Sequence, residues 1–145
     1  MGERPKRNMK DFYAYVSSAP TKKHPENTFT DFRITLPHEL DLKQGEWSVG
    51  ICDLAFKQPM KVLPQFHICC DLIEVNFDST SSQPILKFVH SQESNVKESF
   101  TNVFYSRLKS NILDSFHLYL KPAGETLPSV TDTVFFCTLH FKNHG

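Results

Sequence analysis

The sequence predicts a single all-β domain, an eight-stranded antiparallel sandwich. Its 145 residues fall in the range of about 100–200 residues that one domain usually occupies. The 13 Phe, 4 Tyr and 1 Trp favour strands, because aromatic side chains pack well on a pleated, half-buried surface. Several short segments alternate apolar and polar residues, and turn-forming residues separate them at the spacing of a sandwich or barrel.

The first two predicted strands lie on either side of a loop that contains two prolines. Asp11 to Ser18 is rich in aromatic and β-branched residues and runs into the loop Ala19 to Asn27. Thr28 to Leu36 then alternates with a period of two, and Pro37 is expected to end that strand. Its inward positions are predicted to be Phe32, Ile34 and Leu36.

In each of the next two predicted strands, the apolar residues switch between odd-numbered and even-numbered positions part of the way along. We call this switch a change of parity. In Glu46 to Phe56 this change predicts a β-bulge near Cys52 and Asp53. A similar change within Phe66 to Phe77 predicts a strand that turns a corner between two sheets. The apolar positions before and after the predicted bulge are Trp47, Val49, Ile51, Leu54 and Phe56.

The middle of the chain is expected to hold two short strands. Pro84 opens a strand at Ile85 to His90, and the polar segment Ser91 to Glu98 is predicted to be a loop. Phe100 to Leu108 is predicted to be extended, with a helical turn between Asn102 and Leu113 as the alternative.

Two further segments complete the set of eight. Ser115 to Leu120 alternates cleanly and is closed by the turn residues Pro122 to Gly124. Thr133 to Lys142 has apolar residues on both faces, which predicts a central strand of a sheet.

The charges balance over the whole chain but not at its start. Lys plus Arg and Asp plus Glu both number 16, so nucleic-acid binding by the domain body is not expected. Residues 1–10 are predicted to be a flexible basic arm ahead of the domain at 11–145, either a solvated chain end or a segment that orders on a partner. The candidate partner-binding residues in this arm are Arg4, Lys6, Arg7 and Lys10.

No catalytic, cofactor or metal site is expected. Cys69 and Cys70 are adjacent, so on a strand they point to opposite faces and cannot bind one ion together. With Cys52 and Cys137 they are predicted to be free and largely buried thiols. The chain has no Gly-rich phosphate loop and no pair of carboxylates in an acid–base motif. A non-enzymatic protein is therefore predicted.

Most of the histidines are expected at the surface. His38, His117 and His140 stand at outward positions, as solvated or pocket-lining side chains.

The sequence has no apolar run long enough to span a membrane and no apolar segment behind its basic start, so a protein without a secretory signal is predicted.

Ten short segments along the chain form a common pattern: Phe12-Tyr13, Asn27-Thr28-Phe29, Leu36-Pro37, Asp41-Leu42, Gly45-Glu46-Trp47, Val49-Gly50, Cys70 to Glu74, Pro84 to Leu86, Phe116 to Leu120 and Thr138 to Phe141. In this pattern the chain resembles the short β-rich protein carried by Polinton (Maverick) elements and the related adintoviruses. The resemblance spans nearly the whole chain and is one of pattern. Typical members carry a long insertion after the Trp-containing strand, whereas here only Lys57 to Gln65 joins the strands.

This resemblance implies a virus-like capsid context. A single jelly roll with eight strands then implies a penton or minor capsid subunit of a virion, made in the host cell. Its expected partners are further copies, as a pentamer, and a major capsid protein, with local DNA contact through the basic arm and no membrane. The alternative is a glycan- or receptor-binding module on the same fold, which would use exposed rings such as Trp47, Tyr105 or Tyr119.

Overall fold

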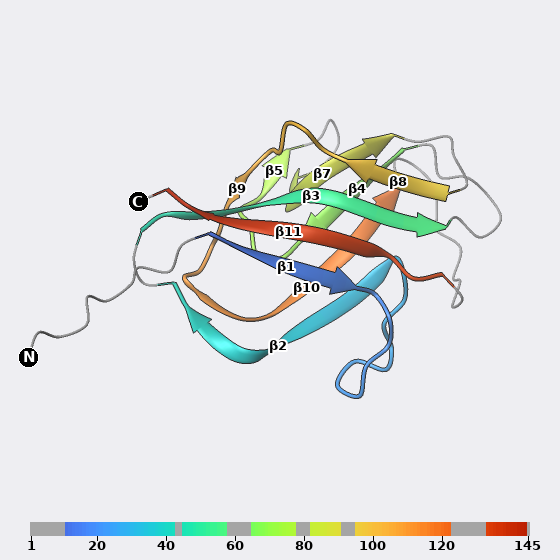
Figure 1. Ribbon diagram of the computed structural model, residues 1–145, viewed down its shortest axis with the longest axis horizontal. Helices are drawn as coiled ribbons and strands as arrows, with labels where there is room; N and C mark the ends of the chain where they lie inside the picture. The colour runs from blue at the N-terminus through green and yellow to red at the C-terminus, as the bar shows by residue number, and fades with distance from the viewer. Residues whose placement is uncertain are drawn as a thin grey trace, which may run out of the picture.

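The computed structural model describes residues 11–42, 45–57, 65–77, 82–90, 95–122 and 133–144. These residues form two antiparallel sheets that pack face to face, with sheet A on the near side in Figure 1. The predicted all-β sandwich is therefore confirmed. The basic arm with Arg4, Lys6, Arg7 and Lys10 lies outside the described residues. No helix that is long and apolar enough to cross a membrane occurs in the described ranges.

Each sheet contains four main strands. Sheet A has the spatial order β1 (Phe12–Ser17), β11 (Phe136–Asn143), β3 (Trp47–Lys57) and β8 (Asn95–Ser99), with β9 (Ser106–Arg107) paired to the start of β3. Sheet B has the order β2 (Asp31–Asp41), β10 (Ile112–Pro122), β4 (Gln65–Cys70) and β7 (Ile85–His90). A short ladder joins β5 (Asn76–Phe77) to β6 (Ser82–Gln83).

The pairing of these strands follows a simple rule along the chain. Among the eight long strands, the first pairs with the last, β1 with β11, and the second pairs with the next to last, β2 with β10. The inner strands continue the rule, because β3 pairs with β8 and β4 with β7. The described chain is therefore one long antiparallel hairpin that is wound around a common core.

The core between the sheets is rich in aromatic rings. Phe12 stacks on Phe141 at a centroid distance of 4.7 Å, and Phe56 meets the edge of Phe66 at 5.6 Å. These contacts come from strands of both sheets, so the two inner faces share one core. The largest fully buried side chains include Phe29, Phe32, Phe66, Phe116, Phe135 and Phe141.

The bulge predicted in the third strand is confirmed. Thr138 of β11 is opposite Asp53 of β3, whereas the next residue, Leu139, is opposite Ile51. Cys52 is therefore the extra residue of β3. Because of it, Ile51 and Leu54 both lie in the core although their positions differ in parity.

The predicted end of the second strand is wrong. β2 does not end at Pro37 but continues to Asp41. It is an edge strand, where proline is tolerated because the missing N–H is not needed by a second neighbour. The register between β2 and β10 shifts between Leu113 and Ser115, opposite this segment.

The segment predicted as one strand at Phe66 to Phe77 is also different. β4 ends at Cys70, and a turn follows before Ile73 forms an isolated bridge with Leu108. The change of parity marks this turn, after which the chain passes from sheet B to sheet A as predicted, because the N–H of Glu74 donates to the carbonyl oxygen of Arg107 in β9.

The strand that follows β7 lies earlier in the chain than the sequence predicts. β8 occupies Asn95–Ser99 and so includes the second half of the predicted loop, because Val96 is buried in the core. Of the extended run predicted at Phe100 to Leu108, only Ser106–Arg107 pairs as a strand, and no helical turn is formed at 102–113. One buried valine in a polar segment is a weak signal, so the pattern favoured a loop.

Candidate functional site: the outer face of sheet A

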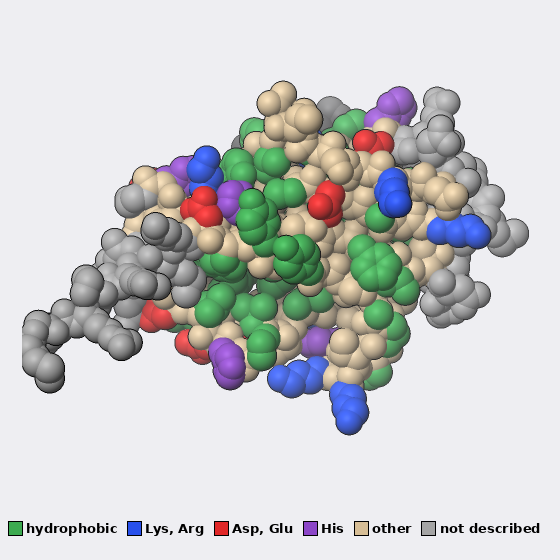
Figure 2. Space-filling view, viewed as in Figure 1, with side chains coloured by type: hydrophobic (Ala, Val, Ile, Leu, Met, Phe, Trp, Pro, Cys, Tyr) green, Lys and Arg blue, Asp and Glu red, His purple; other side chains and the backbone are tan. Residues whose placement is uncertain are grey.

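Three aromatic side chains project from the outer face of sheet A. Tyr13 is 56% exposed, Tyr15 is 83% exposed and Phe136 is 53% exposed. We call these three rings the aromatic face. Figure 2 shows hydrophobic side chains gathered over β1, β11 and β3 on this side of the molecule. Exposed apolar patches of this kind mark interaction surfaces more often than isolated exposed residues do.

Alternation along the strands places these rings outside. On β1, Val16 is buried and Phe12 packs against the core, so Tyr13 and Tyr15 point to the opposite face. On β11, Cys137 and Leu139 are buried, and Phe136 is therefore turned outward.

Two rows of side chains cross the outer face beside these rings. In the first row, Tyr15 is opposite Thr138, followed by Asp53 and Ser99 on the next two strands. The second row runs from Ser17 through Phe136 and Ala55 to Lys97. Since Ala55 has only a methyl group, the face is hollowed at this point into a groove of about 620 Å³.

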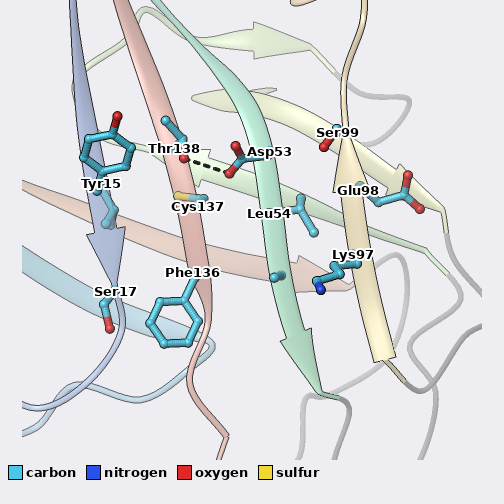
Figure 3. Close-up of a pocket in the computed structure, with 12 residues that line it drawn as sticks. Tyr15, Ser17, Asp53, Leu54, Lys97, Glu98, Ser99, Phe136, Cys137 and Thr138 are labelled. Atoms are coloured by element: carbon cyan, nitrogen blue, oxygen red, sulfur yellow. Dashed lines mark hydrogen bonds between the residues drawn. The ribbon is translucent and has the colours of Figure 1, made fainter.

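The groove combines aromatic and polar groups. Figure 3 shows Tyr15 and Phe136 on one side of it and Lys97 on the other, with Asp53 between them. The Thr138 hydroxyl donates a hydrogen bond of 2.7 Å to Oδ1 of Asp53, which fixes that carboxylate. Both signs of charge line the groove, because Glu98 borders it as well. Such a surface suits contact with polypeptide, which offers both charges and apolar groups.

The other half of the face is held together around His140. Its ring stacks on Tyr13 at 4.5 Å, and its Nδ1 lies 2.7 Å from the Tyr105 hydroxyl. Its Nε2 is 3.4 Å from a carboxylate oxygen of Asp11. The backbone N–H of Asn143 donates to Asp11, and this hydrogen bond lowers the pKa of the carboxyl group below its usual value. These contacts tie the edge strand β1 to β11.

A small residue allows the chain to cross the face at Gly50. A Cβ atom at this position would be 2.5 Å from Cγ1 of Val103 and 2.8 Å from the carbonyl oxygen of Phe104. The segment before β9 therefore lies directly on β3, and it presents Phe104 with an exposed fraction of 62%. Glycine is required here for close approach and not for a special backbone angle.

The outer face of sheet B differs, because its polar side chains contact one another. Nε2 of His117 is 2.6 Å from Oδ1 of Asp31, and the Tyr119 hydroxyl donates to Gln83 at 3.2 Å. Burial raises the pKa of Tyr119 to about 12. These groups are satisfied within the fold, so they leave little for a partner to bind.

The surface rings predicted from the sequence are only partly those observed. Trp47 was expected to be exposed, but it is 3% exposed and packs beside Phe12. Tyr105 and Tyr119 are half-buried. The sequence interpretation missed the aromatic face, although the alternation of Phe12, Ala14 and Val16 with Tyr13 and Tyr15 contains the signal.

The histidines and cysteines follow the predicted pattern in part. His38 is exposed, whereas the side chains of His117 and His140 are 20% and 12% exposed and are held by carboxylates. All four cysteines are free, three of them buried and Cys52 half-buried, as predicted. Burial raises the pKa of Cys70 to about 12. In the described ranges, no group of three or more His, Cys, Asp or Glu side chains has the geometry of a metal site.

Comparison with known proteins adds no relative. No family model, curated protein or solved structure matches this chain.

Proposed function

We propose that the protein is a non-enzymatic structural subunit of a virus-like capsid, a penton or minor capsid component of the virion, and that it assembles through the outer face of sheet A. The single observation that carries this proposal is the aromatic face, where Tyr13, Tyr15 and Phe136 are each more than half exposed. Aromatic residues are enriched where proteins bind one another, because a ring offers a large rigid contact area.

The strand order supports a single jelly roll as the fold of this subunit. Eight long strands in two four-stranded sheets, wound as one long hairpin, agree with that architecture. Capsid proteins share it with lectins and cupins, so the fold narrows the function without selecting it. The resemblance of the sequence pattern to Polinton and adintovirus capsid-module proteins favours the capsid over the other two.

A ring of five subunits requires contact surfaces on each subunit, and we propose that the outer face of sheet A is one of them. A closed ring uses two different surfaces on each subunit, which meet heterologously. A stable contact needs about 800 Å² from each partner. The aromatic face, the groove beside it and the exposed Phe104 supply one of the two surfaces.

The test is the mass of the full-length chain in solution over a range of protein and salt concentrations. We expect a pentamer, or a shift toward one as concentration rises, measured by sedimentation or light scattering. A chain that stays monomeric throughout, and that also fails to associate with a major capsid protein, contradicts the proposal.

A second candidate function is favoured by the groove itself. An exposed ring such as Tyr15 beside the fixed carboxylate of Asp53 is also a suitable surface for a sugar, whose apolar face covers the ring while its hydroxyls bind the polar groups. The protein would then be a glycan-binding attachment module. Saturable binding of neutral oligosaccharides by a monomer, lost in Tyr15→Ala, supports this second candidate over assembly.

A further inference from the structure

A cluster of positive charge forms where the loop after β1 meets the edge strand β2. Lys22 and Lys23 of the loop and Arg33 of β2 surround a hollow of about 330 Å³. Lys and Arg side chains project there at the lower edge of the molecule, over the loop that follows β1 (Figures 1 and 2). The three residues are up to eleven positions apart in sequence, and the fold brings them together.

The loop that carries the two lysines is held in place by hydrogen bonds. The buried Asn27 side chain donates to the carbonyl oxygen of Arg33 at 3.0 Å and accepts from its N–H at 2.9 Å. Nε2 of His24 lies 2.7 Å from the Thr35 hydroxyl, and the His24 N–H donates to the Thr21 hydroxyl at 3.0 Å. The loop is therefore preorganised against β2, so a ligand does not have to order it.

The three cations have no carboxylate partner within the described part of the chain. Of the acidic groups in this part of the chain, Glu26 lies 3.7 Å from His24 and Asp31 contacts His117, and neither pairs with the three cations. Three unpaired positive charges beside two threonine hydroxyls form a local positive field, although the chain as a whole is neutral.

We propose that this cluster, which we call the loop-22 site, binds phosphate groups of the backbone of double-stranded nucleic acid. Lys, Arg and Thr are the side chains that most often contact phosphate oxygens, and such contacts carry no sequence information. No Phe, Tyr or Trp ring is among the side chains that the structure places around the hollow, and the His24 ring there is held by the Thr35 hydroxyl at 2.7 Å, so no free ring is offered for stacking an unpaired base. Binding is therefore independent of sequence. The inference goes beyond the proposed capsid function and does not depend on it.

The experiment measures the affinity of the full-length chain for a short labelled DNA duplex over a range of salt concentrations. Each neutralised phosphate contributes about −0.9 to the slope of log affinity against log salt. Lys22→Gln with Lys23→Gln is expected to reduce the size of the slope by about 2 and to weaken binding equally for unrelated sequences. Arg33→Lys keeps the charge and is expected to retain the wild-type slope, whereas Arg33→Gln reduces it by about 1.

The matched control is Lys57→Gln with Lys109→Gln, which makes the same change in net charge at two exposed lysines elsewhere. We expect the slope of this variant to equal that of the wild type, and thermal unfolding to show that all variants fold. If the slope of the Lys22→Gln, Lys23→Gln variant equals that of the wild type, the proposal is overturned. It is also overturned if both double variants reduce the size of the slope equally. Displacement of the DNA by inorganic phosphate supports phosphate recognition. If hexaglutamate displaces the DNA and inorganic phosphate does not, the proposal is overturned in favour of an acidic peptide.

Discussion

The outer faces of the two sheets use their polar and aromatic residues in opposite ways. On sheet B, His117 is bound by Asp31 and Tyr119 by Gln83, so the side chains satisfy one another. On sheet A, Tyr15 and Phe136 are exposed beside a groove and have no such cover. This difference is the reason why we propose the outer face of sheet A as the assembly surface.

Both faces nevertheless rest on one core. Phe141 of sheet A and Phe116 of sheet B are almost completely buried between the sheets. We expect Phe141→Ala and Phe116→Ala each to lower the free energy of unfolding by about 3–5 kcal/mol, because each leaves a cavity. Chemical denaturation followed by fluorescence and by circular dichroism is the measurement. Two separate transitions, or a loss confined to one sheet, contradict a shared core.

A smaller loss of stability is expected at Gly50 than in the core, and a still smaller one at Ala55, although both residues lie on the outer face of sheet A. Gly50→Ala places a methyl group against Val103 and the backbone of Phe104, and we expect it to cost about 1–3 kcal/mol of stability. Ala55→Ser, at the open groove, is the control and is expected to change stability by less than about 0.5 kcal/mol. Equal costs at the two positions contradict the packing of the 103–105 segment on β3.

The contrast between the faces predicts opposite consequences for one pair of substitutions. Asp31→Asn weakens the contact with His117 on sheet B and is expected to cost about 0.2–1 kcal/mol of stability without any effect on assembly. Tyr15→Ser on sheet A removes a ring that is 83% exposed, so the change in stability is expected to be below about 0.5 kcal/mol while assembly weakens. Denaturation and sedimentation together measure both effects. A loss of assembly in Asp31→Asn, or a loss of stability without a loss of assembly in Tyr15→Ser, would contradict this contrast between the faces.

The smallest expected effect is the pH dependence that Tyr119 introduces on sheet B. Burial raises its pKa to about 12, above the value of about 10 for an unfolded chain. The folded state therefore holds this proton more strongly, so its contribution to stability is complete below about pH 10 and is lost as the pH rises toward 12. Tyr119→Phe is expected to flatten the stability curve in this window. Ultraviolet titration showing all four tyrosines ionising near pH 10 is the contrary result.

Much of the fold could be predicted from alternation, because a strand with one buried face shows its period directly. This holds for β1 and β11 and for the bulge at Cys52, where the apolar positions change parity within one strand. It fails at β8, where only Val96 reports burial, and at Pro37, where an edge position removes the usual penalty. Neither the neighbours of a strand nor its edge position is visible in its own residues.

The candidate surfaces were harder to predict than the strands. Trp47 and Tyr15 are both aromatic residues on strands, but Trp47 shares the parity of the buried Val49 and Ile51, whereas Tyr15 lies on the face opposite to Val16. The loop-22 site was hidden by the zero net charge of the chain, because Lys22 and Arg33 become neighbours only when the loop folds back on β2. Both surfaces depend on contacts between segments that are separate in sequence.

The most direct test of the central claim compares assembly after matched changes on the two faces. Sedimentation of the full-length protein would be measured for Tyr15→Ser with Phe136→Ser on sheet A, and for Phe88→Ser on sheet B, where the ring is 46% exposed. The account predicts that the sheet A variant remains monomeric at concentrations where the wild type and the Phe88 variant form the oligomer. Equal assembly of all three proteins would contradict the claim that the outer face of sheet A is the assembly surface.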